Sequence, residues 1–104
     1  MAASPADRTP LDAAELAALA RTLPAWTLDG AVLRRELRFA DFASAFAFMA
    51  RVAAEAEALD HHPDWSNSWN MVAIALTTHS ARCLTRLDAE LARRIDAIVL
   101  ESAP

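Results

Sequence analysis

Residues 26–39 read WTLDGAVLRRELRF and contain the strongest short hairpin signal of this 104-residue chain, the pair Asp29-Gly30 between two extended runs. After this pair, apolar residues recur at alternate positions, including Leu33 and Leu37, as in a strand with one buried face. The segment therefore predicts two antiparallel strands joined by a tight turn.

A helix is predicted upstream of the hairpin. Leu16, Leu19 and Leu23 recur at helical spacing, and Pro24 ends the segment. Residues 1–10 are predicted to be a loose tail.

A longer helix is predicted downstream, from the N-cap Asp41 to about Leu59. Its inner face is predicted to consist of Phe42, Phe46, Met49, Val52, Ala53 and Ala56. At about 100° per residue, Glu57 falls nearly in line with Phe46, so we expect its carboxylate to point inward at the edge of the apolar stripe.

The second half of the chain repeats the order of strands and helix. Pro63 prevents continuation of the long helix, and the alternation over residues 64–78 predicts a second strand pair with a poorly marked turn. Thr85-x-x-Asp88 is an acidic variant of the capping box. It opens a final helix whose predicted inner stripe is Leu87, Leu91, Ile95 and Ile98.

The predicted element order is α-β-β-α-β-β-α in a single domain over residues 1–104. Because strand pairs and helices are segregated, the pattern favours an α+β fold: a four-stranded antiparallel sheet with three helices packed on one face. Its uncovered face or an edge strand could support oligomerisation. Arg35 breaks the apolar alternation of its strand, so we expect the sheet there to meet solvent or a partner at one edge.

Composition excludes several classes of protein. The net charge of −4 and the scattered basic residues argue against nucleic acid or an anionic membrane as a partner. A single cysteine, Cys83, cannot form an intramolecular disulfide and favours a reducing compartment, so we expect a cytoplasmic protein. Neither an export signal nor a run of about 20 apolar residues is apparent.

Three histidines, His61, His62 and His79, are the candidate chemical groups. Imidazoles give or take a proton near neutral pH, so their concentration indicates a proton-transfer site. Consecutive residues of an extended segment point in opposite directions, so we expect His61 and His62 to face different ways. Glu57 precedes this pair by one helical turn, and a pocket there could hold the carboxylate and the imidazoles together.

Other interpretations of these residues stay open. Three imidazoles and a glutamate could ligate zinc, although the spacing of metalloprotease ligands is absent. Trp65 and Trp69 could wall a flat pocket or belong to the core, and Asp60 could orient a histidine or simply end the helix. Asp88 has a sufficient role as a helix cap, and nothing in the sequence indicates that Cys83 is an activated nucleophile.

A compound pattern covers nearly the whole chain. Its segments are Glu57-x-x-x-His61-His62-Pro63-x-Trp65, Asn70-x-Val72-x-Ile74-x-Leu76-x-Thr78-His79, Thr85-x-x-Asp88, Phe39-x-x-Phe42-x-x-Ala45-Phe46-x-Phe48-Met49-x-x-Val52-Ala53 and the isolated Trp26. This pattern resembles that of the pterin-4a-carbinolamine dehydratases. The chain departs from it at Cys83, where the family usually has glycine, and at Trp69, where tyrosine is common.

The resemblance implies dehydration of 4a-hydroxytetrahydropterin to quinonoid dihydropterin, which recycles the cofactor of aromatic amino acid hydroxylases. It implies His61 and His79 as proton donors and His62 as a pterin ligand that assists as base. The substrate-binding residues that it implies are Glu57, Asp60, Pro63, Trp65 and Thr78. Neither a metal nor a cofactor is implied, since the pterin is the substrate. A homodimer or homotetramer is expected, and an oligomeric coactivator module is the implied alternative.

Overall fold

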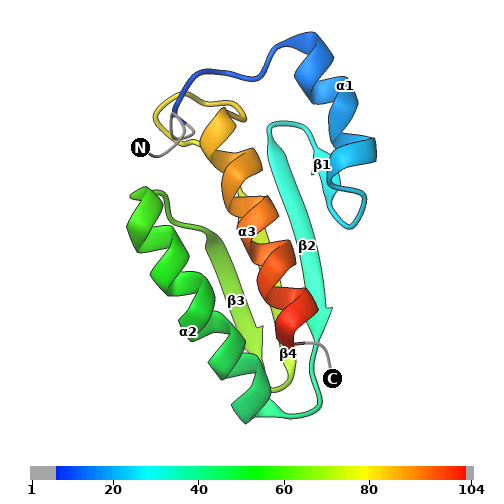
Figure 1. Ribbon diagram of the computed structural model, residues 1–104, viewed down its shortest axis with the longest axis vertical. Helices are drawn as coiled ribbons and strands as arrows, with labels where there is room; N and C mark the ends of the chain where they lie inside the picture. Colours follow the sequence, from blue (N-terminus) through cyan, green and yellow to red (C-terminus); the bar gives the residue numbers. More distant parts are fainter. Residues whose placement is uncertain (1–6, 103–104) are drawn as a thin grey trace.

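The computed structural model describes residues 7–102 and has the predicted element order (Figure 1). Its elements are α1 (Ala13–Thr22), β1 (Thr27–Asp29), β2 (Val32–Arg38), α2 (Phe42–Leu59), β3 (Asp64–Ser68), β4 (Met71–Leu76) and α3 (Arg86–Ser102). The strands form one antiparallel sheet in the order β1-β2-β4-β3. The predicted α+β fold is therefore confirmed.

The hairpin at Asp29-Gly30 forms as predicted. Asp29 pairs with Val32, so Gly30 and Ala31 make a two-residue turn in which Gly30 has a φ of 61°. Glycine adopts this left-handed conformation without steric cost. β2 then pairs with β4, which joins this hairpin to the β3–β4 hairpin in a single sheet.

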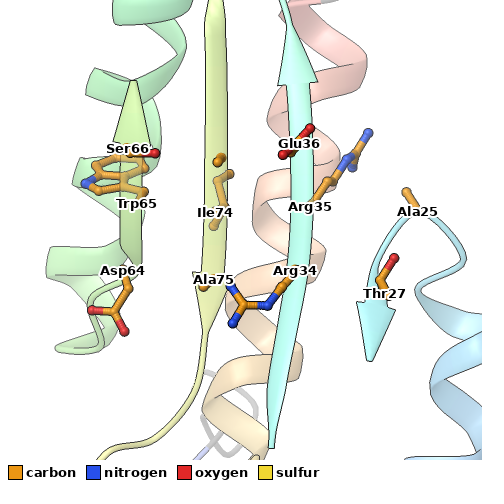
Figure 2. A pocket seen from close by; sticks show the side chains of 11 residues that line it. Ala25, Thr27, Arg34, Arg35, Glu36, Asp64, Trp65, Ser66, Ile74 and Ala75 are labelled. Atoms are coloured by element: carbon orange, nitrogen blue, oxygen red, sulfur yellow. The ribbon is translucent and has the colours of Figure 1, made fainter. Parts of the chain in front are cut away.

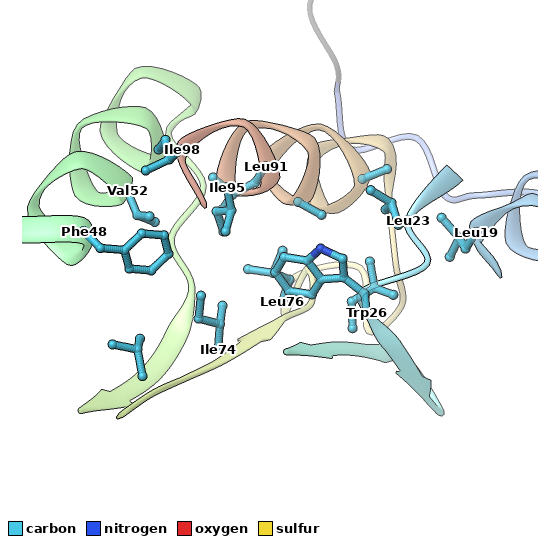
Figure 3. Close-up of a cluster of buried hydrophobic side chains, with 14 of the residues drawn as sticks. Leu19, Leu23, Trp26, Phe48, Val52, Ile74, Leu76, Leu91, Ile95 and Ile98 are labelled. Carbon is cyan, nitrogen blue, oxygen red and sulfur yellow. The ribbon is translucent and has the colours of Figure 1, made fainter. Parts of the chain in front are cut away.

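Helices α2 and α3 cover one face of the sheet, and α1 lies beside the β1 edge (Figure 1). Side chains of α2 and α3 meet Ile74 and Leu76 of β4 in the core (Figure 3). Because side chains alternate along a strand, Ala73 and Ala75 face away from the helices. The predicted inner stripe of α3 is buried, which confirms it.

The predicted inner face of α2 is partly wrong. Phe48, Val52 and Ala56 are buried, whereas Phe42 and Phe46 are 50% and 57% exposed. Alanine and phenylalanine occur on most sides of this helix. Apolar periodicity alone therefore does not identify the buried face. Despite this composition, no helix within residues 7–102 is long and apolar enough to span a membrane.

Both ends of α2 are defined by polar groups. Asp41 accepts a hydrogen bond from the Ser44 backbone N–H at 2.7 Å, and this bond lowers the pKa of Asp41 below its ordinary value. At the other end Asp60 adopts a left-handed φ of 51°, and its N–H donates to the carbonyls of Ala56 and Glu57. The sharp stop places the histidine pair directly after the helix.

The sequence predicts that the sheet around Arg35 meets solvent or a partner at one edge, whereas the Arg35 side chain is largely buried within the fold. It lies opposite Ile74 on the helix-covered face, and its guanidinium pairs with Asp96 of α3. Asp96 also accepts a hydrogen bond from the Trp26 indole N–H at 2.8 Å. The arginine is tolerated inside because a carboxylate on the covering helix meets it.

Two residues of the predicted tail, Asp7 and Thr9, are hydrogen-bonded to the start of α3. The carbonyl of Asp7 accepts a hydrogen bond from the Leu87 N–H at 3.0 Å, and that of Thr9 accepts one from the Arg86 N–H at 3.1 Å. The chain from Asp7 therefore runs beside the start of α3. The rest of the predicted tail, residues 1–6, lies outside the described residues.

Candidate active site

The three histidines lie in two connections at one end of the sheet. His61 and His62 connect α2 to β3, and His79 follows β4 in the loop that leads to α3. Because β3 and β4 pair antiparallel, the start of one lies beside the end of the other. The topology thus brings two distant segments of the sequence together.

Each imidazole has a carboxylate of its own. The pairs, with the distance from Nε2 to the nearest carboxylate oxygen, are His61–Asp88 at 2.6 Å, His62–Glu57 at 2.6 Å and His79–Asp64 at 2.9 Å. An ionised carboxylate can only accept hydrogen bonds, so Nε2 carries the proton in each contact. Nδ1 is then the ring nitrogen left for a substrate.

His61 is the buried member of the set, with 7% of its surface exposed, and Asp88 is completely buried. The second oxygen of Asp88 accepts hydrogen bonds from the Thr78 hydroxyl at 2.8 Å and from the Thr85 backbone N–H at 2.9 Å. A carboxylate inside a protein is stable only when such donors satisfy it. This network holds the His61 ring through its Nε2 atom.

From the sequence, helix capping is a sufficient role for Asp88. The contact with the Thr85 N–H fits that role, but the other oxygen of Asp88 holds His61. A signal was available, because Asp88 lies one turn before Leu91 and two turns before Ile95, on the inner stripe of the helix. A carboxylate on a buried stripe requires a partner.

His62 and His79 are exposed, with 57% and 74% of their side-chain surfaces accessible. The predicted divergence of His61 and His62 is therefore confirmed. Glu57 is 79% exposed, so the prediction that it points inward is wrong. The prediction for Glu57 rests on its alignment with Phe46, and Phe46 itself lies on the outer side of α2.

The remaining predicted residues surround the histidines in different ways. The Asp60 carbonyl accepts a hydrogen bond from Arg8 Nη2 at 2.9 Å, while its own side chain bonds none of the histidines. Pro63 separates the histidine pair from β3, and Trp65 packs against the core. Asp64, which no sequence motif singles out, is the partner of His79.

A hollow of about 620 Å³ lies on the uncovered face of the sheet (Figure 2). Its lining includes Ala73 and Ala75 of β4 and Asp64 and Trp65 of β3, but no histidine. A second hollow of about 460 Å³, lined by residues of α1 and α3, also lacks a histidine. The sequence predicts a crevice lined by the three imidazoles, but neither hollow is lined by a histidine. The larger hollow is lined by Asp64, the hydrogen-bond partner of His79.

No group of three or more His, Cys, Asp or Glu side chains in residues 7–102 is arranged to hold a metal ion. Each imidazole instead engages a separate carboxylate through Nε2. The ligand set that the zinc interpretation needs is therefore not assembled in the described part of the chain.

Comparisons with known proteins agree with this constellation. The family model described as "Pterin 4 alpha carbinolamine dehydratase" matches residues 9–98, which include all three histidines and their carboxylates. A protein of Synechococcus sp. (strain WH7803) named "Putative pterin-4-alpha-carbinolamine dehydratase" is 51% identical over 88 residues, which cover 85% of this chain and 95% of that protein.

Two solved structures have a similar fold. A transcriptional coactivator/pterin dehydratase from Brucella melitensis matches with a TM-score of 0.81 and 41% identity, over 86% of this chain and 98% of that chain. A pterin dehydratase-like protein identified as a RuBisCO assembly factor in the alpha-carboxysome matches with a TM-score of 0.59 and 24% identity, over 70% of this chain and 84% of that chain. The second likeness concerns the fold alone.

Proposed function

This chain belongs to the pterin-4a-carbinolamine dehydratase family, and on that premise we propose that it converts 4a-hydroxytetrahydropterin to quinonoid dihydropterin. The observation that carries the proposal is the set of three histidine–carboxylate pairs at one end of the sheet. Loss of the 4a-hydroxyl needs one proton delivered to the departing oxygen and another removed from a ring nitrogen. Positioned imidazoles can perform both transfers.

The roles follow the position of each group in the family motif. His61 and His79 are proposed as the proton donors flanking C4a: one of them, as an imidazolium, gives its Nδ1 proton to the departing hydroxyl while the other hydrogen-bonds to the same oxygen. His62 is proposed to bind the pterin and to assist as the base that takes the proton from the ring nitrogen. Glu57, exposed beside His62, can accept hydrogen bonds from the amide and amino groups of the pterin. Thr78 acts through Asp88, because its hydroxyl already donates to that carboxylate.

The surrounding contacts are proposed to come from Asp60, Pro63 and Trp65. The reaction as written forms no covalent intermediate and uses neither a metal nor a cofactor. An aromatic amino acid hydroxylase is the proposed source of the substrate, and the cytoplasm is the proposed setting.

The test follows quinonoid dihydropterin formation from enzymatically generated carbinolamine. The wild type should exceed the spontaneous rate, and His61→Ala or His79→Ala should each lower kcat by about 10²–10⁴-fold. His62→Ala should raise KM more than it lowers kcat. Ser68→Ala, at the far end of β3, is the matched control and should behave as wild type. A wild type with no acceleration would refute the proposal.

A second candidate function is an oligomeric binding module, and the outer side of α2 favours it. Phe42 and Phe46 are exposed there with ring centroids 5.8 Å apart, and the exposed neighbours Ala43, Ala47 and Ala50 extend the apolar surface. Large exposed apolar surfaces mark interaction sites. We propose that a second copy of this chain covers the surface, in a homodimer or homotetramer.

Sedimentation of the purified protein tests this association. The wild type should sediment as a dimer or tetramer, and Phe46→Glu should shift it toward the monomer, because the added charge would be buried without a partner. Ala17→Glu places the same charge on an exposed position of α1 and should leave the assembly intact. A monomeric wild type, or an intact Phe46→Glu assembly, would contradict the proposal.

A further inference from the structure

His79 differs from His61 in how its ring is held. His61 is enclosed by the core and by the Asp88 network, whereas most of the His79 side chain is in solvent. Within residues 7–102, the hydrogen bond from Nε2 to Asp64 Oδ2 at 2.9 Å is the polar contact of that ring. An exposed histidine without such a contact samples several rotamers.

The backbone around His79 is already fixed. The Arg82 N–H donates to the carbonyls of Thr78 and His79 at 2.9 and 3.2 Å, and the Thr78 N–H donates to the Cys83 carbonyl at 3.2 Å. This compact turn sets where the His79 Cα lies. It leaves the direction of the ring undetermined.

Asp64 comes from a rigid element. It is the first residue of β3 and pairs with Ala75 of β4, so its backbone is fixed by the sheet. Trp65 and Asn67 alternate with it and lie toward the helices, which directs Asp64 to the uncovered face (Figure 2). The strand therefore presents a carboxylate at a defined place beside a loop histidine.

We infer that Asp64 is a positioning residue that holds the His79 ring in one orientation, with Nε2 donating to the carboxylate and Nδ1 directed to the pterin. This inference rests on the proposed function and gives the carboxylate of β3 a part in it. The role is not one of stability. Exposed ion pairs contribute little to folding, so the pair can be removed without unfolding the protein.

The test combines kinetics with NMR of Asp64→Ala, Asp64→Asn and wild type. Asp64→Ala should lower kcat by about 10-fold and leave KM within about 2-fold, since a misdirected proton donor reacts less often in an otherwise intact site. The three-bond couplings that report χ1 of His79 should change from a single rotamer to an average. Asp64→Asn retains an acceptor oxygen and should restore both measurements most of the way.

Glu36→Ala is the matched control, because Glu36 is another carboxylate lining the same hollow and has no histidine partner. It should leave the His79 couplings and kcat unchanged. A single His79 rotamer in Asp64→Ala, or an averaged rotamer with unchanged kcat, would overturn the inference while leaving the dehydratase proposal standing. An inactive wild type would refute the dehydratase proposal, and the couplings would still report whether Asp64 holds the ring.

Discussion

Asp88 shows how a single residue can link folding to chemistry. Its two oxygens accept hydrogen bonds from His61 of the α2–β3 connection and from Thr78 and Thr85 of the β4–α3 connection. Each donor is itself buried, so removing the acceptor would strand polar groups away from water. The same carboxylate that closes the start of α3 therefore also orients an imidazole.

Asp88→Asn should lower the free energy of unfolding by about 3 kcal/mol, because the amide turns one acceptor into a donor that faces other donors. Urea denaturation measures the change. The control is Glu101→Gln at the exposed end of the same helix, which should cost less than about 0.5 kcal/mol. An Asp88→Asn protein as stable as this control would show that the network is not needed for folding.

At the scale of elements, strong local signals predicted the structure well. The sequence predicted both the Asp29-Gly30 turn and the buried stripe of α3 correctly. Each pattern is compatible with only one placement of its apolar side chains in the core. The orientation of α2 was not, since phenylalanine and alanine occur on both of its sides. Glu57 and Asp64 were misjudged or missed for a related reason: their histidine partners depend on contacts between elements.

The loop after β4 gives a second case. The family usually has glycine at position 83, where this chain has Cys83, but the residue of this loop with a positive φ is Arg82, at 56°. Arg82→Gly should therefore raise the free energy of unfolding by about 0.5–1 kcal/mol by relieving a left-handed conformation.

Cys83→Gly is the paired variant and should lower the free energy of unfolding by a similar amount, since it adds chain flexibility where none is required. Both changes can be read from urea midpoints at constant m-value. Equal effects of the two substitutions would argue against strain at position 82.

At the scale of the whole molecule, Asp96 joins three layers of the structure. It pairs with Arg35 of β2 and accepts a hydrogen bond from the Trp26 indole of the segment between α1 and β1, while it belongs to α3. The Arg35 side chain is only 16% exposed. The sequence showed an arginine out of place but not its partner, because the two residues meet only after the sheet and helices pack.

Asp96→Ala should lower the free energy of unfolding by about 2–4 kcal/mol, because it leaves the largely buried guanidinium of Arg35 without a partner. Trp26→Phe removes only the indole donor from the same carboxylate and should cost closer to about 1 kcal/mol through that bond. Thermal and urea unfolding monitored by circular dichroism would rank the two. A smaller loss for Asp96→Ala than for Trp26→Phe would contradict this account.

The three tryptophans occupy three distinct surroundings, and this gives the protein built-in optical probes. Trp26 is buried beside Asp96, Trp65 is partly buried next to Asp64, and Trp69 is exposed in the β3–β4 turn, at the end of the sheet remote from the histidines. Fluorescence of single-tryptophan variants can therefore separate three events: loss of the core, changes beside Asp64, and changes at the distant turn.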